Sequence, residues 1–311
     1  SLGGVVVVSL PLAYYAGFVV EQRFRLSNQT PRSWFIFQLK TWLVGAVFAA
    51  ILVGGLYALL WHGGRYWSIW LWVGVMILSV VIAKVFPLVI LPLFYPARPL
   101  ERPSLKQRLE QMATGSGLRL TGVYDLALSK DTRKANAMLA GLGSSRRVYL
   151  SDTLLASFND DQIAVVFAHE LGHHLRGHIW KGIGLSAVVS SILVALIHWR
   201  LQPCAAQPSL WPYAIAALPQ ILLLATVYPL LIAPMTNAIS RRFERQCDSD
   251  ALRLTENPHA YRTAFEQLGL LNLSDPNPPR WEVILFDDHP PLAERIAMAS
   301  YVPGDHREPR T

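Results

Sequence analysis

The sequence is poor in charged residues, and acidic residues are absent from long stretches of it. Charged residues make up 16% of the 311 residues, whereas a soluble globular domain carries about 25%. Of the 21 acidic residues, only Glu21 precedes Glu101, and none lies between Glu170 and Glu244. Because 52% of the residues are hydrophobic and ten are Trp, the composition excludes an ordinary soluble globule and is typical of a protein that contacts lipid.

Cysteine is scarce as well, and Cys204 and Cys247 are the two in the chain. A disulfide-stapled scaffold is therefore excluded, and the high apolar content excludes a disordered or fibrous protein. The net charge of +7 is a feature that many nucleic-acid-binding proteins share, but in a membrane protein the positions of the basic residues matter more than their sum. We therefore expect membrane lipids, and no nucleic acid, among the partners.

The uncharged runs predict five membrane-spanning helices, since a helix needs about 20 mostly apolar residues to cross a bilayer. The runs cover residues 1–20, 41–64, 66–83, 182–199 and 210–233. We expect the third helix to end near Lys84, followed by a proline-broken apolar segment at the membrane interface. The first three helices define an N-terminal transmembrane region of residues 1–97, and the last two interrupt a second domain of residues 98–311.

The distribution of Lys and Arg predicts the orientation of the chain. Three segments are rich in these residues: 21–40, 96–181 and the tail after residue 240. Two short loops are poor in these residues. The loop between the second and third spans contains only Arg65, and the loop between the fourth and fifth spans is bordered only by Arg200. Basic residues concentrate in cytoplasmic loops, so both large polar regions of this integral, multi-pass membrane protein are predicted to be cytoplasmic. The chain begins at Ser1 in apolar sequence, unlike a signal peptide, and we expect that one or more spans before it are missing.

A small α+β domain is predicted for the first large polar region. It opens with a helical pattern over residues 105–113, and three strands are expected over residues 118–128, 135–141 and 146–150. The last two strands flank a short Gly- and Ser-containing segment that indicates a hairpin. Asn159, with Gln162 three residues later, predicts the start of a further helix.

That helix carries the run His169-Glu170-Leu171-Gly172-His173. Two His residues four positions apart project from one face of a helix, so both imidazoles can bind one Zn²⁺ at about 2.0–2.1 Å. Glu170, beside the first ligand, can then act as general base toward the zinc-activated water. The plainer alternative is a pair of surface histidines on an amphipathic helix. We favour a catalytic site with one Zn²⁺ per chain.

A catalytic zinc needs a third protein ligand and leaves one position open. The next acidic residue along the chain is Glu244, in a stretch without Pro or Gly that predicts a helix leaving the last span. Asp248 follows four residues later on the same face. We expect Glu244 to bind zinc and Asp248 to accept a hydrogen bond from a ligand histidine. The alternative is that Arg241 and Arg245 form surface helix pairs with these two acids.

The sequence resembles the integral-membrane zinc metallopeptidases of the M48 family in three features. These are the His-Glu-Leu-Gly-His motif, the two spans after it, and a Ser-Arg pair followed by Glu244 and Asp248. The CAAX prenyl protease (Ste24-type) branch fits better than the HtpX-type branch. Further matching stretches are residues 92–95, 135–137, 141–143, 147–155 and 289–296. The chain differs from the family pattern at His174 and Cys247, where relatives often have Trp and Ala. His178 matches a further histidine of the family, for which we expect a structural role.

The resemblance implies a mainly α fold. It would be a multi-pass transmembrane helical bundle with a cytoplasmic α+β zincin-like metallopeptidase domain that carries a small β-hairpin or sheet. Members of the family have seven spans, so two would be missing upstream in this chain.

The resemblance also implies roles for residues outside the zinc motif. Asn136 and Ala137 would lie on an edge strand that binds the substrate backbone by strand addition; the alternative is a plain hairpin strand. His289 would donate a hydrogen bond to the developing oxyanion, or would only begin a helix over residues 290–300. Arg295 would orient this region or pair with an acid of the zinc site.

The sequence therefore predicts a membrane-embedded zinc metalloendopeptidase of the gluzincin type, with Zn²⁺ held by His169, His173 and Glu244. The resemblance implies that its substrates are peptides or proteins at the membrane, cleaved near the C-terminus, with lipid-modified (prenylated, CAAX-type) chains as the leading class. Two alternatives are a membrane-protein quality-control protease without prenyl dependence and a non-catalytic scaffold in which Cys247 closes the fourth zinc position. The sequence gives no indication of the oligomeric state.

Overall fold

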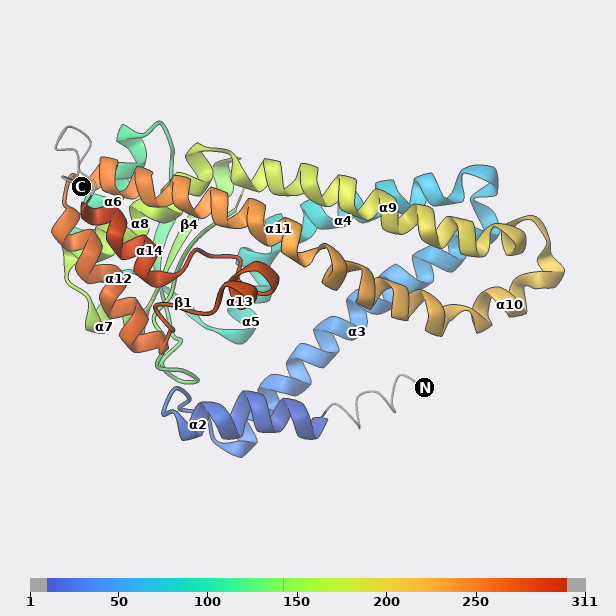
Figure 1. The fold of residues 1–311 in the computed structure, drawn as a ribbon, viewed down its shortest axis with the longest axis horizontal. Coiled ribbons are helices and arrows are strands. Elements are labelled where there is room, and N and C mark those ends of the chain that lie inside the picture. Colours follow the sequence, from blue (N-terminus) through green and yellow to red (C-terminus); the bar gives the residue numbers. More distant parts are fainter. Residues whose placement is uncertain (1–9, 142, 301–311) are drawn as a thin grey trace.

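The computed structural model describes residues 10–141 and 143–300 and shows an elongated, mainly α-helical chain. Long helices extend together toward one end of the molecule, and a compact domain with a small sheet lies at the other end (Figure 1). The predicted fold class is confirmed, because a bundle of long apolar helices carries an α+β domain.

Four helical segments in the described residues are long and apolar enough to cross a membrane. They are α3 (Pro31–His62), α4 (Trp67–Val85) with its continuation, α9 (His178–Ala206), and α10 (Trp211–Ala216) with α11 (Leu218–Thr255). Large apolar side chains such as Trp199 and Leu231 are exposed on them, as expected for helices that face lipid. The predicted span over residues 1–20 lies partly outside the described residues. Its described part is helical, passes through a π-helical stretch (Tyr15–Val20) and ends in the short α2 (Glu21–Arg23).

The helix α3 begins earlier than its uncharged core. It starts at Pro31, because the Thr30 hydroxyl accepts a hydrogen bond from the Ser33 N–H at 3.2 Å and proline fits the first helical turn. Lys40, on this additional part, donates to the carbonyl oxygen of Leu93 at 3.2 Å. The predicted start at residue 41 was therefore wrong, since long basic side chains are tolerated near the end of a spanning helix.

The proline-containing segment after Lys84 continues α4. A π-helical turn (Phe86–Ile90) accommodates Pro87 and leads directly into α5 (Leu91–Phe94). The Tyr149 hydroxyl donates to the Pro87 carbonyl oxygen at 2.7 Å, which fixes this helix end against the compact domain. Helix α4 thus ends near Lys84 as predicted, and the proline interrupts it with a π-helical turn while the helical path continues to Phe94.

The compact domain contains a four-stranded sheet with the strand order β1-β2-β4-β3. Its strands are β1 (Ala97–Pro99), β2 (Gly122–Leu126), β3 (Ala137–Ala140) and β4 (Arg147–Ser151). β3 and β4 pair antiparallel around a 3₁₀ turn (Gly143–Ser145), which confirms the predicted hairpin; residue 142 of the connection lies outside the described residues. β2 runs parallel to β4, and β1, which was not predicted, pairs antiparallel with β2. This order leaves β3 at an edge of the sheet.

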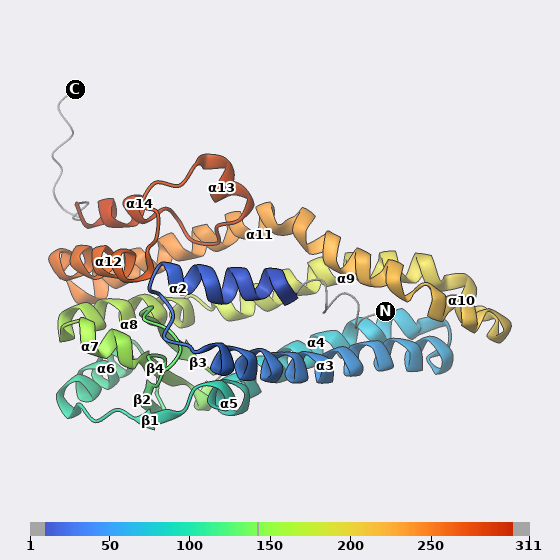
Figure 2. The same ribbon diagram turned by 90° about the horizontal axis from the view of Figure 1, so that it is seen from below.

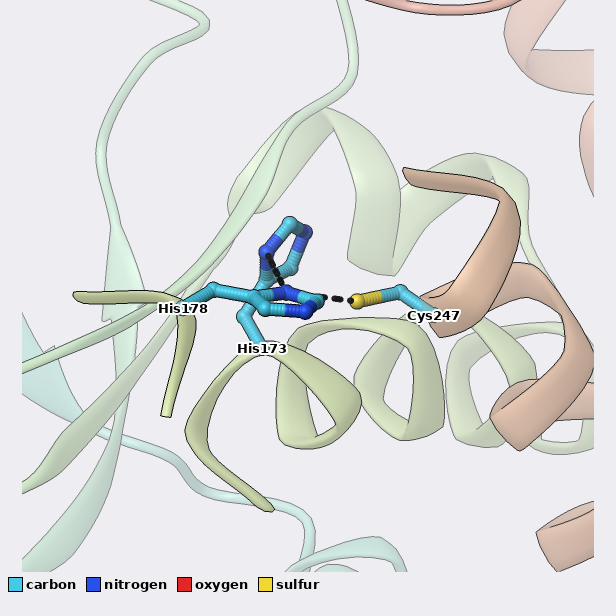
Figure 3. A group of neighbouring side chains, drawn as sticks. All are labelled: His173, His178 and Cys247. Atoms are coloured by element: carbon cyan, nitrogen blue, oxygen red, sulfur yellow. Dashed lines mark hydrogen bonds between the residues drawn. The ribbon is translucent and has the colours of Figure 1, made fainter. Parts of the chain in front are cut away.

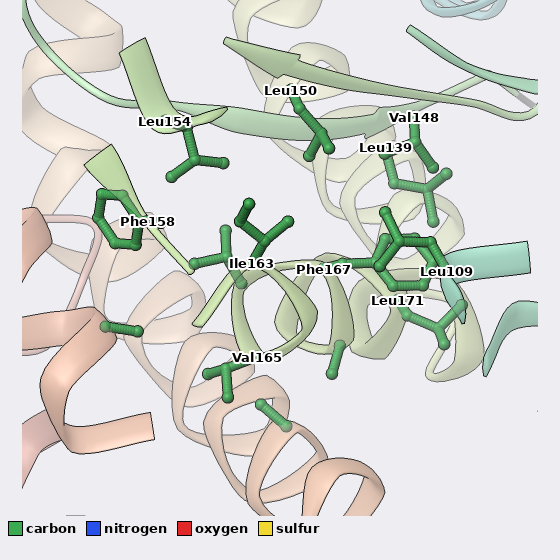
Figure 4. Packing of buried hydrophobic residues seen from close by; sticks show 14 of the residues in the cluster. Leu109, Leu139, Val148, Leu150, Leu154, Phe158, Ile163, Val165, Phe167 and Leu171 are labelled. Atoms are coloured by element: carbon green, nitrogen blue, oxygen red, sulfur yellow. The ribbon is translucent and has the colours of Figure 1, made fainter. Parts of the chain in front are cut away.

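Helix α8 (Asp160–Leu175) lies at the centre of the domain. Its predicted start is confirmed, because the Asn159 side chain accepts from the Gln162 N–H at 2.9 Å and the Gln162 side chain accepts from the Asn159 N–H at 3.1 Å. Figure 4 shows its apolar side chains packed against those of the sheet: Ile163, Phe167 and Leu171 against Leu139, Val148 and Leu150. The remaining helices of the domain are α6 (Pro103–Gly115), α7 (Asp152–Ser157), α12 (Pro258–Asn272), α13 (Arg280–Leu285) and α14 (Leu292–Ala297). Further 3₁₀ turns are Gly64–Tyr66, Pro208–Leu210 and Met298–Ser300.

Helix α11 connects the bundle to the compact domain and runs along much of the molecule (Figures 1 and 2). Pro229 and Pro234 lie within its apolar half. Its other half packs along α8, where the Arg176 guanidinium donates to Asp250 at 2.5 and 2.9 Å. The spacing of α8 and α11 therefore determines how their facing side chains meet.

Gly172 sets this spacing. A Cβ atom at this position would lie 3.1 Å from Cys247 Cα and 3.3 Å from Cys247 Sγ, which is shorter than the optimal separation of about 3.5–4.0 Å. Any larger residue at position 172 would therefore push α11 away from α8 by a few tenths of an ångström.

If His169, His173 and Glu244 bind zinc as the sequence predicts, Gly172→Ala should weaken zinc binding by about 10-fold, because α11 carries Glu244. The free energy of unfolding should change by less than about 2 kcal/mol, because the higher helix propensity of Ala offsets part of the overpacking cost. Competition with a chromophoric chelator measures the zinc affinity. Gly184→Ala in α9 is the control, because its Cβ would meet nothing within 4 Å. Unchanged zinc affinity in Gly172→Ala would show that the ligands tolerate the shift.

Candidate metal centre and catalytic site

Three side chains converge between α8 and α11. His169 and His173 project from successive turns of α8, and Glu244 faces them from α11. His169 Nε2 lies 3.1 Å from Glu244 Oε2, and His173 Nε2 lies 3.2 Å from Glu244 Oε1. His169 and Glu244 are buried, with 6% and 4% of their surface exposed. The structure thus brings together the three residues predicted as metal ligands.

The hydrogen bonds around this group fit a metal ion. His169 Nδ1 lies 2.8 Å from Asp248 Oδ1, so in the neutral ring Nδ1 carries the proton and Nε2 turns a lone pair toward Glu244. Glu244 Oε2 is buried, and no described residue donates a hydrogen bond to it. Two electron-rich atoms facing each other in a buried site are unfavourable unless a cation lies between them. Two imidazoles and a carboxylate are a ligand set that catalytic zinc uses, so these residues fit that metal.

Asp248 and Arg295 support His169 at its Nδ1, and Arg295 Nη2 also lies 3.7 Å from Glu244 Oε2. Arg295 donates to Asp248 from Nε at 2.9 Å and from Nη2 at 2.7 Å, and its guanidinium lies 4.2 Å from the centre of the Phe265 ring. Burial lowers the pKa of His169, but the neighbouring carboxylates of Asp248 and Glu244 outweigh it and raise the pKa to about 9. The two carboxylates therefore favour a positive charge beside His169, which a metal ion would supply. Of the two expectations for Arg295, the structure shows the pair with an acid of the site.

The arginines that flank Glu244 do not pair with the acids of α11. Arg241 is buried and donates to the backbone carbonyl oxygens of Val283, at 2.6 Å, and Asp287. Arg245 Nε donates to Glu294 at 2.5 Å. The alternative of surface helix pairs is therefore wrong, because α13, α14 and the loop between them fold back over α11.

Arg241 thereby holds the loop that carries His289. His289 Nε2 lies 3.4 Å from Glu244 Oε2, and its Nδ1 lies 2.6 Å from Asp288 Oδ1. The hydrogen bond with Asp288 raises the pKa of His289 against the opposing effect of burial, and the charge of Glu244 raises it further. Helix α14 begins only at Leu292, so His289 does not start a helix, and that alternative is wrong. His289 instead offers a ring N–H at the rim of the site.

Glu170 lies beside the edge strand β3. The Leu139 N–H donates to Glu170 Oε2 at 3.4 Å, and His174 Nε2 lies 2.8 Å from the Leu139 carbonyl oxygen. Because the pairing groups of an antiparallel strand alternate in direction, Ala137 turns its backbone N–H and C=O to this same edge. Glu170 is thus placed next to the edge that would receive a substrate strand.

The backbone of Asn136 faces the other way. The Ser151 N–H donates to the Asn136 carbonyl oxygen at 2.9 Å, and the Asn136 N–H donates to Ser151 Oγ at 3.0 Å. Of the two residues predicted to bind the substrate backbone, only Ala137 therefore presents its backbone to the edge. Asn136 is exposed, and it lines a cavity together with His169 and Glu170.

A cavity of about 520 Å³ lies between β3, α8, α12 and the segment leading to α14. Its lining contains most of the predicted site residues: Asn136, Ala137, His169, Glu170, His289 and Arg295. Asn272 also lines it, and its side chain accepts from the Ala135 N–H at 3.0 Å and donates to the Ala135 carbonyl oxygen at 3.3 Å. The Asn272 amide thus occupies the sheet edge beside Ala135 in the way a peptide would.

Sequence reasoning missed Asp288, Asn272 and the role of Arg241. Asp288 could have been identified from the sequence, because it directly precedes the candidate catalytic residue His289. Asn272 gave none, because its contact with Ala135 joins residues 137 positions apart. Arg241 was placed at the helix surface, since the sequence does not show that α13 and its following loop cover it.

Two family models match the chain. One, described as Peptidase family M48, matches residues 99–302. The other, described as CAAX prenyl protease N-terminal, five membrane helices, matches residues 4–96.

Individual proteins are similar over nearly the whole chain. The metalloprotease YhfN of Bacillus subtilis, described as uncharacterized, is 28% identical over 298 residues, which cover 94% of this chain and 70% of the relative. CAAX prenyl protease 1 of Saccharomyces cerevisiae is 27% identical over 315 residues, which cover 95% of this chain and 69% of the relative. The crystal structure of S. mikatae Ste24p superposes with a TM-score of 0.84 at 24% identity, covering 96% of this chain and 74% of that one. At this identity the structural likeness shows the fold alone.

Proposed function

The chain belongs to peptidase family M48 and is therefore a metalloprotease embedded in a membrane; from this premise we propose that it is a zinc endopeptidase that cleaves near the C-terminus of prenylated, membrane-associated substrates. The peptidase domain in this proposal is residues 98–311, interrupted by two spans, and residues 1–97 form a transmembrane region. The relatives named as CAAX prenyl proteases, which match almost the whole chain, support the substrate class.

One observation carries the proposal. Glu244 Oε2 is buried without a hydrogen-bond donor among the described residues, and it lies 3.1 Å from His169 Nε2. His169 and Glu170 line the same cavity as Ala137. Three candidate metal ligands, a candidate general base and an open strand edge thus meet at one place, which is the requirement for metal-assisted hydrolysis of an extended peptide.

In the proposed reaction, His169, His173 and Glu244 would hold one Zn²⁺, and this ion would supply polarisation of the scissile carbonyl and a lowered pKa of the attacking water. Glu170 takes a proton from that water and later passes it to the leaving amine, so it serves first as base and then as acid. His289 Nε2 lies 3.4 Å from Glu244 Oε2, so its ring N–H is placed to donate a hydrogen bond to the developing oxyanion.

The remaining residues orient these groups. Ala137 binds the substrate backbone as an added strand, and the scissile bond then lies beside Glu170, because Glu170 contacts the same edge at Leu139. Asp248 and Arg295 hold the His169 ring in the tautomer that presents Nε2 to the metal.

We also place the peptidase domain on the cytoplasmic side. The basic N-terminal segment contacts this domain: Lys134 Nζ lies 3.0 Å from Glu21 Oε1, and the Arg133 N–H donates to the Leu26 carbonyl oxygen at 2.8 Å. Both regions are rich in Lys and Arg and lie on one side of the bundle. The preference of basic loops for the cytoplasm supports this orientation.

A pair of peptides that differ only in a farnesyl group tests the substrate class. We expect kcat/KM for the farnesylated CAAX peptide to exceed that of the unmodified peptide by at least about 10-fold, because this factor corresponds to the burial of only about two methylene groups. Mass spectrometry of the products identifies the bond that is cleaved, and the metal-free protein provides the background. Equal cleavage of both peptides would favour a quality-control protease without prenyl dependence. No cleavage of any peptide by the zinc-loaded protein would contradict the peptidase proposal.

A further inference from the structure

A second group of potential metal ligands lies directly behind His173. His178 Nδ1 lies 3.2 Å from His173 Nδ1 and 3.5 Å from Cys247 Sγ, and Figure 3 shows the His178 ring between the other two side chains. His178 and Cys247 are buried, with 6% and 0% of their surface exposed. The Cys247 thiol thus lies with His178, outside the group formed by His169, His173 and Glu244, and the proposed reaction uses neither of them.

The two ring nitrogens of His173 face different partners. Nε2 lies 3.2 Å from Glu244 Oε1, where a zinc ligand must present a lone pair. In the neutral ring the proton is then on Nδ1, which faces His178. Two ring nitrogens can form a hydrogen bond only if one donates and the other accepts. His178 Nδ1 must therefore present a lone pair to His173.

The other side of His178 agrees with this assignment. Its Nε2 lies 3.1 Å from the side-chain oxygen of Gln246, which is an acceptor, so the proton of the neutral His178 ring is on Nε2. The Phe243 ring stacks on His178 with centroids 4.2 Å apart and planes inclined by 11°. His178 is therefore held in one plane with one tautomer, ready to accept from His173.

We infer that His178 is a positioning residue that, together with Gln246, fixes His173 in the tautomer and orientation that bind the metal. The inference rests on the proposed function, in which His173 is a zinc ligand. His178 does for His173 what Asp248 does for His169, with a neutral acceptor in place of a carboxylate. A chain of hydrogen bonds, which we call the relay, runs from His173 through His178 to Gln246. Each N–H donor in it faces an acceptor.

A second metal ion in this group is the rival explanation. It would require His173 to lose its remaining ring proton while Nε2 holds the first metal, and it would require the fully buried Cys247 thiol to ionise. Both changes are costly in a buried site. The hydrogen-bond relay needs neither of them.

Three variants of the full chain in detergent test the relay through zinc affinity, measured by chelator competition. His178→Phe keeps a flat ring against Phe243 but removes the acceptor, and we expect it to weaken zinc binding by about 10–100-fold. His178→Asn places an amide oxygen near the position of Nδ1, and we expect it to restore the affinity to within about 3-fold of wild type. Gln246→Leu removes the far acceptor and should give a smaller loss in the same direction. Thermal unfolding of each metal-free variant checks that the fold is retained.

Each result decides the matter. Wild-type zinc affinity in His178→Phe would overturn the relay, and so would equal weakening in His178→Phe and His178→Asn, because ring packing would then explain the loss. If His178→Phe does not fold, Gln246→Leu reports on the same relay from its far end, and an unchanged affinity there overturns it. Two zinc ions per chain would favour a second metal site over the relay. So would a thiolate-to-cobalt charge-transfer band in the spectrum of the cobalt-loaded protein, if Cys247→Ala abolishes that band. If the zinc affinities follow the expected order but wild type cleaves no peptide, the relay stands and the proposed function fails.

Discussion

Replacing Glu170 with Gln is expected to slow peptide cleavage by about 10²–10⁴-fold while leaving the bound zinc in place. Gln has the shape of Glu but cannot take a proton from the attacking water. Glu170 does not belong to the group of ligand atoms formed by His169, His173 and Glu244. Its contact with the Leu139 N–H, at 3.4 Å, can be made equally well by an amide oxygen. The measurements are kcat with a fluorogenic peptide and zinc content by elemental analysis.

A second acid of the same helix provides the control. Asp161 lies in the first turn of α8, and its carboxylate pairs with Arg108 at 2.7 Å with 55% of its side chain exposed. We expect Asp161→Asn to retain both cleavage and zinc, because exposed ion pairs contribute little. Normal cleavage by Glu170→Gln would remove Glu170 from the mechanism. Loss of zinc from that variant would instead place Glu170 in the metal site.

Local spacing accounts for the features that the sequence predicted well. The start of α8 depends on Asn159 and Gln162, which satisfy each other's N–H groups within one turn. The geometry of one helix also fixes the spacing of His169 and His173, which is why the structure brings both to Glu244. The β3–β4 hairpin is similarly local, because a short turn joins its two strands.

Contacts between distant segments account for what the sequence did not show. The strand β1 pairs with residues more than twenty positions away, and three residues are too few for a periodic pattern. The Asn272 amide meets Ala135 across 137 positions, and Arg241 reaches Val283 across 42 positions. The approach of Glu244 to the histidines depends on Gly172, since any side chain there would push α11 away. Such contacts form only when segments far apart in the sequence pack together in the folded chain.

Replacing Glu244 with Ala is expected to abolish tight zinc binding, with a loss larger than the 10–100-fold that removal of an outer supporting residue costs. The variant keeps His169 and His173 but lacks the third protein ligand of a catalytic zinc site. Peptide cleavage at a low zinc concentration should fall with the metal content. Glu294→Ala is the control, because Glu294 pairs with Arg245 on the same helix with 44% of its side chain exposed, and we expect it to bind zinc like wild type.

The same variant separates metal binding from folding. In metal-free wild type, burial raises the pKa of Glu244, but His169 and His173 outweigh it and lower that pKa. The fold therefore stabilises the Glu244 carboxylate, and metal-free Glu244→Ala should be less stable than metal-free wild type. Added zinc at 100 times the wild-type Kd should stabilise wild type by about 2.7 kcal/mol and the variant by much less. A Glu244→Ala chain that zinc still stabilises fully would show that the third ligand lies elsewhere, whereas a variant that unfolds without metal would show that Glu244 acts through packing.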